Sequence, residues 1–146
     1  MKIGIATDHH GVEIKKKLIE YLKASGYEVI NYGTDSTDMV DYPEYAIKVG
    51  EEVVNGKINY GILLCGTGIG MSIACNKVKG VRCAKVDSLE EAKLTREHND
   101  ANVLALNSSI SKEKMKEIIR IFLNTSFLGE RHLRRVEKIR RYEDER

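Results

Sequence analysis

The residues best suited to chemistry stand together where a short apolar run gives way to glycine. Tyr60 to Cys65 is apolar, as expected of a strand buried on both faces. Glycines at alternate positions follow, from Gly66 to Gly70, and a helix is expected over 69–75. Several backbone N–H groups can then point into one concavity, where the positive end of the helix favours an anion. The same field favours the thiolate of Cys65, so the sequence predicts an oxyanion-binding nest with a base or nucleophile beside it.

Other interpretations of this stretch stay open. Cysteine is among the most buried residue types, so Cys65 could be a packing residue, and glycines are common in turns. The glycine spacing lacks the G-x-G-x-x-G fingerprint of dinucleotide sites, and no Gly-Lys-Ser/Thr follows as in a P-loop. A thiol phosphatase is excluded because position 71, where a Cys-x5-Arg loop would place its arginine, is Met71.

Length and composition indicate one soluble globular domain spanning residues 1–146, with 42% hydrophobic and 32% charged residues. A net charge of +2 argues neither for nor against a polyanionic partner. No apolar run is long enough to span a membrane, and the N-terminus enters a strand without a signal-peptide pattern. Three cysteines without a CxxC pair disfavour a disulfide framework and a structural zinc site. We therefore expect a cytoplasmic protein with reduced thiols, no membrane partner and no metal.

The elements that must position these residues alternate along the chain. Strands are predicted at 2–7, 27–32, 60–65, 81–85 and 101–106, and helices at 12–24, 43–55, 69–75, 89–97, 112–123 and 131–143. This alternation predicts an α/β protein with a five-stranded parallel sheet and right-handed crossovers. Such folds bind ligands outside the carboxyl ends of their strands. Three polar clusters are expected at that edge, namely Asp8-His9, the stretch 65–70, and His98-Asn99.

The C-terminal helix is strongly basic, and three interpretations of it stay open. Arg131 and Arg135 are four residues apart on one face, an arrangement that suits a phosphate. The basic face could instead be solvated, or paired with Glu137, Glu143 and Asp144. A nucleic-acid-binding arm is disfavoured by these acids and by the scarcity of aromatic residues.

Taken together, five motifs in this order resemble the type B ribose-5-phosphate isomerases, members of the RpiB/LacA/LacB sugar-phosphate isomerase family. The motifs are Asp8-His9, Asp41-Tyr42-Pro43, Cys65 to Gly70, His98 to Asn102, and Arg131 to Arg135. The resemblance covers essentially the whole chain. It implies a Rossmann-like three-layer α/β/α sandwich, a homodimer or tetramer, and metal-free, cofactor-free interconversion of ribose 5-phosphate and ribulose 5-phosphate in the pentose phosphate pathway.

The resemblance also implies a role for each matching residue. Cys65 is the base that moves a proton between C1 and C2, and the backbone of 66–70 holds the enediolate oxygen. His98 assists opening of the sugar ring, with Thr67 nearby. The substrate-binding positions implied are Asp8, His9, Tyr42, Gly66, Gly68, Ile69, Gly70 and Asn99. The phosphate ligands implied are His9, Arg131 and Arg135, the two arginines reaching the site from the partner subunit.

Two positions depart from the family pattern. Ser109 stands where many members carry a phosphate-binding arginine, which is expected to weaken phosphate binding or change its geometry. A second histidine, His10, follows His9; we assign the site role to His9 and expect His10 to belong to the start of the helix. Isomerisation of a six-carbon sugar phosphate, such as allose or galactose 6-phosphate, is the alternative activity. A non-catalytic phosphosugar-binding module is the third hypothesis.

Overall fold

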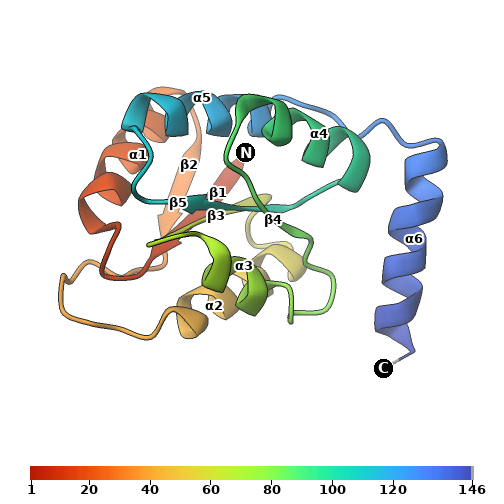
Figure 1. Cartoon of the computed structure of the whole chain (residues 1–146), viewed down its shortest axis with the longest axis horizontal. Helices are drawn as coiled ribbons and strands as arrows, with labels where there is room; N and C mark the ends of the chain where they lie inside the picture. Colours follow the sequence, from red (N-terminus) through yellow and green to blue (C-terminus); the bar gives the residue numbers. More distant parts are fainter. Residues whose placement is uncertain (146) are drawn as a thin grey trace.

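The structure, a computed structural model, describes residues 1–145 and contains every strand and helix that the sequence predicts (Figure 1). The strands are β1 (Lys2–Thr7), β2 (Glu28–Asn31), β3 (Tyr60–Cys65), β4 (Cys83–Lys85) and β5 (Val103–Asn107). The helices are α1 (Val12–Ala24), α2 (Tyr42–Val54), α3 (Ile69–Cys75), α4 (Leu89–Asn99), α5 (Lys112–Leu123) and α6 (Arg131–Asp144). The predicted bounds differ from these by no more than two residues at either end.

All strands pair in parallel, in the order β2-β1-β3-β5-β4. The chain builds outward from β1 to β2 and then resumes on the other side of β1 with β3. The order therefore reverses between β1 and β3, and ligands of such sheets bind in the crevice at this reversal. Asp8 follows β1, and its N–H donates to the carbonyl of Leu64 in β3, 3.2 Å away. The residues after β1 and those after β3 are thereby held side by side at the carboxyl edge.

Side chains of β3 alternate between two buried cores, one on each face of the sheet. Ile62 and Leu64 pack against the layer formed by α1, α4 and α5. Leu63 and Cys65 pack against α2 and α3 on the other face. Figure 1 shows α1, α4 and α5 above the sheet and α2 and α3 below it. A three-layer sandwich results, and β3 is buried on both faces as its apolar run predicts.

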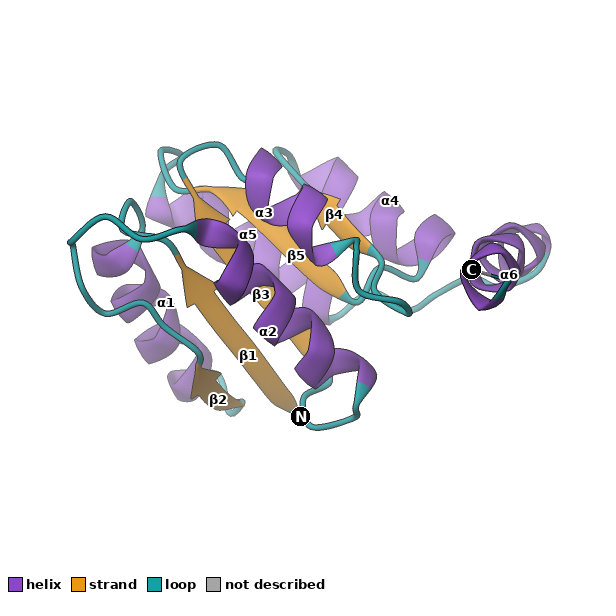
Figure 2. Ribbon diagram, turned by 90° about the horizontal axis from the view of Figure 1, so that it is seen from below, coloured by secondary structure: helices purple, strands orange, loops and turns teal. Residues whose placement is uncertain are grey.

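Helix α6 lies beside this sandwich, joined to it by one stretch of chain (Figures 1 and 2). Its C-terminal end is attached by acids: Glu143 accepts from the N–H of Gly80 at 3.2 Å, and Asp144 pairs with Lys79 at 3.1 Å. Arg140 approaches Asp100 at 3.8 Å. Part of the helix is thus attached through ion pairs, as one of the sequence interpretations expects. Within residues 1–145, no helix has the length and apolar character needed to cross a membrane.

Candidate active site

Cys65 lies at the end of β3 with its sulfur inside the predicted nest. The N–H of Gly68 donates to Cys65 Sγ at 3.0 Å, and this contact is buried. The carbonyl of Cys65 accepts from the N–H of Ser108, 2.9 Å away, which fixes the residue against the loop after β5. A hydrogen bond from an amide stabilises a thiolate more than a thiol because the acceptor then carries the charge. Helix α3 has only seven residues, so this amide contributes more directly than the helix dipole.

Glycine is required at two positions of the nest. Gly68 has a φ of 84°, a left-handed conformation, and a Cβ there would lie 3.0 Å from the carbonyl carbon of Leu106. A Cβ at Gly70 would lie 2.6 Å from the ring of Tyr42. The ring of Tyr42, at the start of α2, is therefore packed directly on the nest. Thr67 is exposed, and its hydroxyl accepts from the N–H of Ile69 at 3.2 Å.

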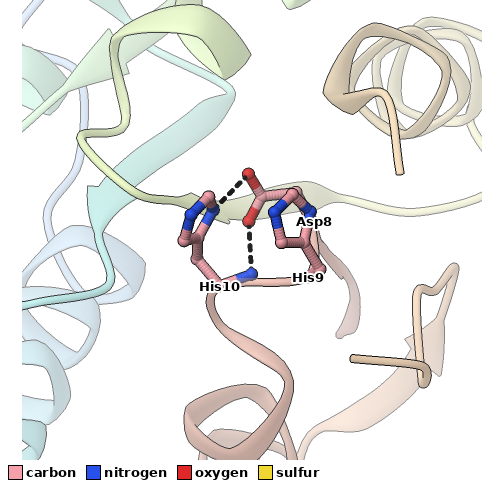
Figure 3. A group of neighbouring side chains, drawn as sticks. All are labelled: Asp8, His9 and His10. Carbon is pink, nitrogen blue, oxygen red and sulfur yellow. Dashed lines mark hydrogen bonds and ion pairs between the residues drawn. The ribbon is translucent and has the colours of Figure 1, made fainter. Parts of the chain in front are cut away.

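Asp8 brings a second cluster to the same edge, together with both histidines that follow it (Figure 3). The side chain of Asp8 is 7% exposed. Its Oδ1 accepts from the backbone N–H of His10 at 2.9 Å, and its Oδ2 lies 3.1 Å from His10 Nδ1. His10 directly precedes Gly11, the N-cap of α1, so it stands at the start of the helix as expected, and its ring is in addition tied to Asp8. The sequence signal for this contact was the spacing of Asp8 and His10, because an aspartate side chain often accepts from the backbone N–H two residues later and closes a turn.

His9 points to the other side of Asp8 and closes the loop that leads to α2. Its Nδ1 accepts from the N–H of Val40 at 3.3 Å, and its ring centroid lies 4.2 Å from that of His10. Possible ligand atoms of Asp8, His9 and His10 all lie within 4.8 Å of one another, the one such group found among residues 1–145. These atoms already share hydrogen bonds, and a tetrahedral zinc ion would need bonds of about 2.1 Å to each. Binding an ion would break those hydrogen bonds.

A separate cluster gathers around α4 and α6. The rings of His98 and His132 stack at a centroid distance of 4.2 Å and an interplanar angle of 13°. His132 is buried, and its Nε2 has no hydrogen-bond partner among the described residues. Burial lowers the pKa of His132, and the charges of His98, Arg131 and Arg135 lower it further. Arg131 and Arg135, which flank His132 in the sequence, are exposed, and so is Asn99, which follows His98.

The structure corrects one expectation: His98 and Asn99 do not lie at the carboxyl edge. Helix α4 runs back across the sheet before β5 begins, and the carbonyl of Asn99 accepts from Nε of Arg82 at 3.0 Å, just before β4. In the register of β3 with β5, Cys65 pairs with Asn107 at the far end of the strand. Four residue steps along β5 amount to roughly 13 Å. His98 therefore belongs to the opposite edge of the sheet from Cys65 in the same chain.

The predicted residues thus form two groups. At the carboxyl edge lie Asp8, His9, Tyr42, Cys65, Gly66, Thr67, Gly68, Ile69 and Gly70. At the amino edge lie His98, Asn99, Arg131 and Arg135. Ser109 follows β5 at the carboxyl edge, where its N–H donates to Oδ1 of Asn107 at 2.7 Å. The sequence assigned no site role to His10 or His132; for His132, the signal was its place between two arginines on a helix.

Comparison with known proteins is consistent with this geometry. The model of the family described as "Ribose/Galactose Isomerase" matches residues 3–139. Ribose-5-phosphate isomerase B of Escherichia coli is 42% identical over 146 residues, covering 99% of this chain and 98% of that protein. Ribose-5-phosphate isomerase B of Clostridium thermocellum superposes with a TM-score of 0.97 at 44% identity, covering 99% of each chain.

A further solved structure is that of ribose-5-phosphate isomerase B from Mycoplasma genitalium, which contains bound ribulose-5-phosphate. It superposes with a TM-score of 0.95 at 43% identity, covering 99% of this chain and 97% of that one. The family model spans nearly the whole chain, and these relatives match it end to end. The chain therefore belongs to the Ribose/Galactose Isomerase family.

Proposed function

We propose that this protein interconverts ribose 5-phosphate and ribulose 5-phosphate through an enediolate, with Cys65 as the base. The observation that carries this proposal is the hydrogen bond from the Gly68 N–H to Cys65 Sγ, inside a glycine nest at the end of β3. A base next to an oxyanion-binding concavity is what abstraction of a proton beside a carbonyl requires. Relatives of this chain are named ribose-5-phosphate isomerase B, and that name describes the same reaction.

In the open-chain aldose, the thiolate of Cys65 removes the proton from C2. The electron pair of that C–H bond forms the C1=C2 bond, and the carbonyl oxygen on C1 takes the negative charge. The amides of 66–70 stabilise this oxygen. The thiol then returns the proton to C1, while the hydroxyl proton on O2 passes to O1 and leaves the ketone at C2. No oxidant or reductant enters, so the reaction is a balanced isomerisation.

Ring opening is a separate proton transfer, and we assign it to His98. The imidazole takes the proton from the anomeric hydroxyl and a proton is delivered to the ring oxygen, so the C1–O4 bond breaks. An imidazole suits both steps because it can accept and donate protons near neutral pH. The hydroxyl of Thr67 at the nest can contact the anomeric oxygen during this step. The ring of His132, buried and stacked on His98, holds the orientation of the His98 ring.

Arg131 and Arg135 bind the phosphate in this scheme, with His9 and Asn99 contacting the sugar phosphate and Tyr42 bordering the nest. Neither arginine has an ion-pair partner among residues 1–145, so their charges are free for a ligand. Phosphate binding far from the reacting carbon orients the substrate and leaves Cys65 to the proton transfer.

The site is shared between two copies of the chain. Cys65 and His98 lie at opposite edges of one rigid sheet, so they can act on one sugar only if His98, Arg131 and Arg135 come from a neighbour. Apolar side chains on the exposed faces of α3 and α6, including Ile69, Ile73, Leu133 and Ile139, are available for such an interface. A homodimer is the smallest assembly that completes two sites.

Replacing the base tests the reaction. We expect Cys65→Ala to lower kcat for ribose 5-phosphate by about 10³-fold or more, since a general base typically contributes about 10²- to 10⁴-fold. Binding of the sugar phosphate and the melting temperature should change little, because alanine fits the Cys65 position. Cys83→Ala is the control, since it removes a thiol far from the nest. A Cys65→Ala enzyme with more than a tenth of the original kcat would contradict the assignment.

Subunit mixing tests the shared site. Cys65→Ala and Arg135→Ala chains should each be inactive as pure proteins, because every site in each homodimer lacks one group. After subunit exchange, half of the subunits pair as hybrids, and one of the two sites in each hybrid is intact. About a quarter of the original activity should therefore return. Absence of rescue after exchange confirmed by native mass spectrometry would show that each site is built within one chain.

A further inference from the structure

We infer that His10 binds the sugar directly and that Asp8 acts through it, as a positioning residue for the imidazole. This inference rests on the proposed function, because it places the sugar over the nest beside Cys65. It also reassigns position 8, which the sequence predicted to contact the sugar itself. The pair lies at the switch point of the sheet, next to the first residue of the nest.

The contacts of Asp8 leave its carboxylate turned toward its own loop. One oxygen accepts from the His10 backbone N–H at 2.9 Å and the other faces His10 Nδ1 at 3.1 Å, as Figure 3 shows. The Asp8 side chain is only 7% exposed, whereas that of His10 is 55% exposed. A ligand arriving at this edge therefore meets the imidazole before the carboxylate. The held ring loses less conformational freedom on binding than a free surface histidine would.

The position of the ring brings it alongside the reacting end of the sugar. A Cβ added at Gly66 would lie 3.8 Å from Nδ1 of His10 and 3.9 Å from Cε1 and Cγ. The ring thus borders the nest, close enough that any side chain at the residue directly following Cys65 would touch it. A substrate whose C1–C2 unit lies over Cys65 must pass beside this ring.

Hydrogen bonding fixes which nitrogen of the His10 ring carries the proton. An ionised carboxylate only accepts, so Asp8 Oδ2 requires the proton of His10 on Nδ1. In the neutral ring, Nε2 then carries a lone pair and accepts from a hydroxyl. His9 is in the opposite state, since its Nδ1 accepts from the Val40 N–H and its proton is therefore on Nε2.

Two adjacent imidazoles in opposite tautomers present one acceptor and one donor, with ring centroids 4.2 Å apart. A polyhydroxylated phosphate ester offers both a hydrogen-bond donor and a hydrogen-bond acceptor to match them. A sugar hydroxyl can donate to Nε2 of His10, while an ester or phosphate oxygen can accept from Nε2 of His9. The loop thereby distinguishes a sugar phosphate from inorganic phosphate, which has no carbon-bound hydroxyl to donate.

Steady-state kinetics with ribose 5-phosphate test the contact. His10→Ala should raise KM by about three- to tenfold, the loss of one hydrogen bond, with kcat changed less than KM. His10→Gln can place an oxygen near the position of Nε2 and should recover most of this loss, whereas His10→Asn reaches only the position of Nδ1 and should not. Glu13→Gln, on the exposed face of α1, is the control and should match the original enzyme.

The dependence on Asp8 has its own signature. In Asp8→Asn, the new amide N–H would donate to His10 Nδ1, so the ring proton moves to Nε2 and the acceptor becomes a donor. This variant should raise KM as much as His10→Ala, and the double variant should be no worse than either single one. Additive effects would show that Asp8 contacts the sugar independently and would overturn the pairing.

Binding measured by NMR separates this inference from the proposed reaction. The Hε1–Cε1 signal of His10, assigned by comparison with His10→Gln, should shift in a saturable manner with ribose 5-phosphate and not with inorganic phosphate. If the protein fails to isomerise the sugar but the signal shifts in this way, the reaction is wrong and the contact stands. An unmoved signal, or a KM of His10→Ala equal to that of the original enzyme, would overturn the contact.

Discussion

Replacing Gly68 with alanine perturbs the nest at the residue whose N–H contacts Cys65 Sγ. The backbone of Gly68 is left-handed, with φ of 84°, and a Cβ would lie 3.0 Å from the carbonyl carbon and 3.2 Å from the carbonyl oxygen of Leu106. Those atoms belong to β5, a central strand, and cannot yield without disturbing the sheet. The loop itself must move, and its N–H moves with it.

The expected magnitudes follow from these contacts. A left-handed conformation costs an ordinary residue about 1–2 kcal/mol, and overpacking adds about 1–3 kcal/mol. We therefore expect Gly68→Ala to lose about 2–5 kcal/mol of unfolding free energy. A hydrogen bond to a charged group contributes about 1.5–3 kcal/mol. If the displaced amide no longer stabilises the thiolate, kcat should fall by about one to two orders of magnitude.

Gly56→Ala is a matched control for the backbone strain. Gly56 has φ of 76°, and a Cβ there would meet nothing within 4 Å. This variant should lose about 1–2 kcal/mol from the left-handed conformation alone and keep the original kcat. Urea unfolding followed by circular dichroism gives the free energies, and a coupled assay of ribulose 5-phosphate gives kcat. A Gly68→Ala enzyme that is destabilised but retains kcat within threefold would refute the proposed role of this amide.

Two further predictions concern the pH dependence of stability. Hydrogen bonds from the buried Lys15 at 2.6 Å and from Asn31 lower the pKa of Asp35, so its contribution is present above the unfolded value of about 3.9 and is lost as the pH falls through the lower folded value. Asp35→Asn should therefore be less stable than the original protein at pH 7, with the gap closing in urea titrations below pH 4. Burial, and then the charge of Glu52, raises the pKa of Tyr32 to about 12. Because the unfolded phenol ionises first, stability should fall more steeply between about pH 10 and 12 than in Tyr32→Phe, and equal slopes in the two proteins would contradict this.

Local sequence signals were sufficient for the elements and for the nest. The alternation of apolar runs with helical segments predicts five strands and six helices. The residue Ser88 just before the predicted helix at 89–97 suits an N-cap, and in the structure it caps α4 by accepting from the N–H of Glu91 at 3.1 Å. The nest was predictable because its residues are consecutive, so one strand end and one helix start determine their placement. The same holds for Tyr42, whose neighbour Pro43 marks the start of α2.

The prediction failed where it required the direction of a crossover. A helix between two parallel strands starts at the carboxyl edge and ends at the amino edge, so residues in its last turn, such as His98, lie away from Cys65. This rule also follows from the sequence, and it overrides the expectation that the polar pair His98-Asn99 lies at the ligand edge. The link between Asp8 and His10 was less accessible, because it depends on the rotamers of two side chains in one turn.

In the proposed shared site, the separation of the two groups accounts for a basic helix that lies beside the domain (Figure 1). Cys65 is fixed by the hydrogen-bonded ladders of β3, and Asn99 is fixed by Arg82 at the other edge, so neither can move across the sheet. A helix folded onto its own domain could bring its arginines only to the amino edge, where no nest exists. A helix that projects from the domain can reach the carboxyl edge of a neighbour. In the homodimer that we propose, substitutions in α6 should accordingly alter the chemistry at the Cys65 of the other chain, so hybrid dimers are more informative than either homodimer.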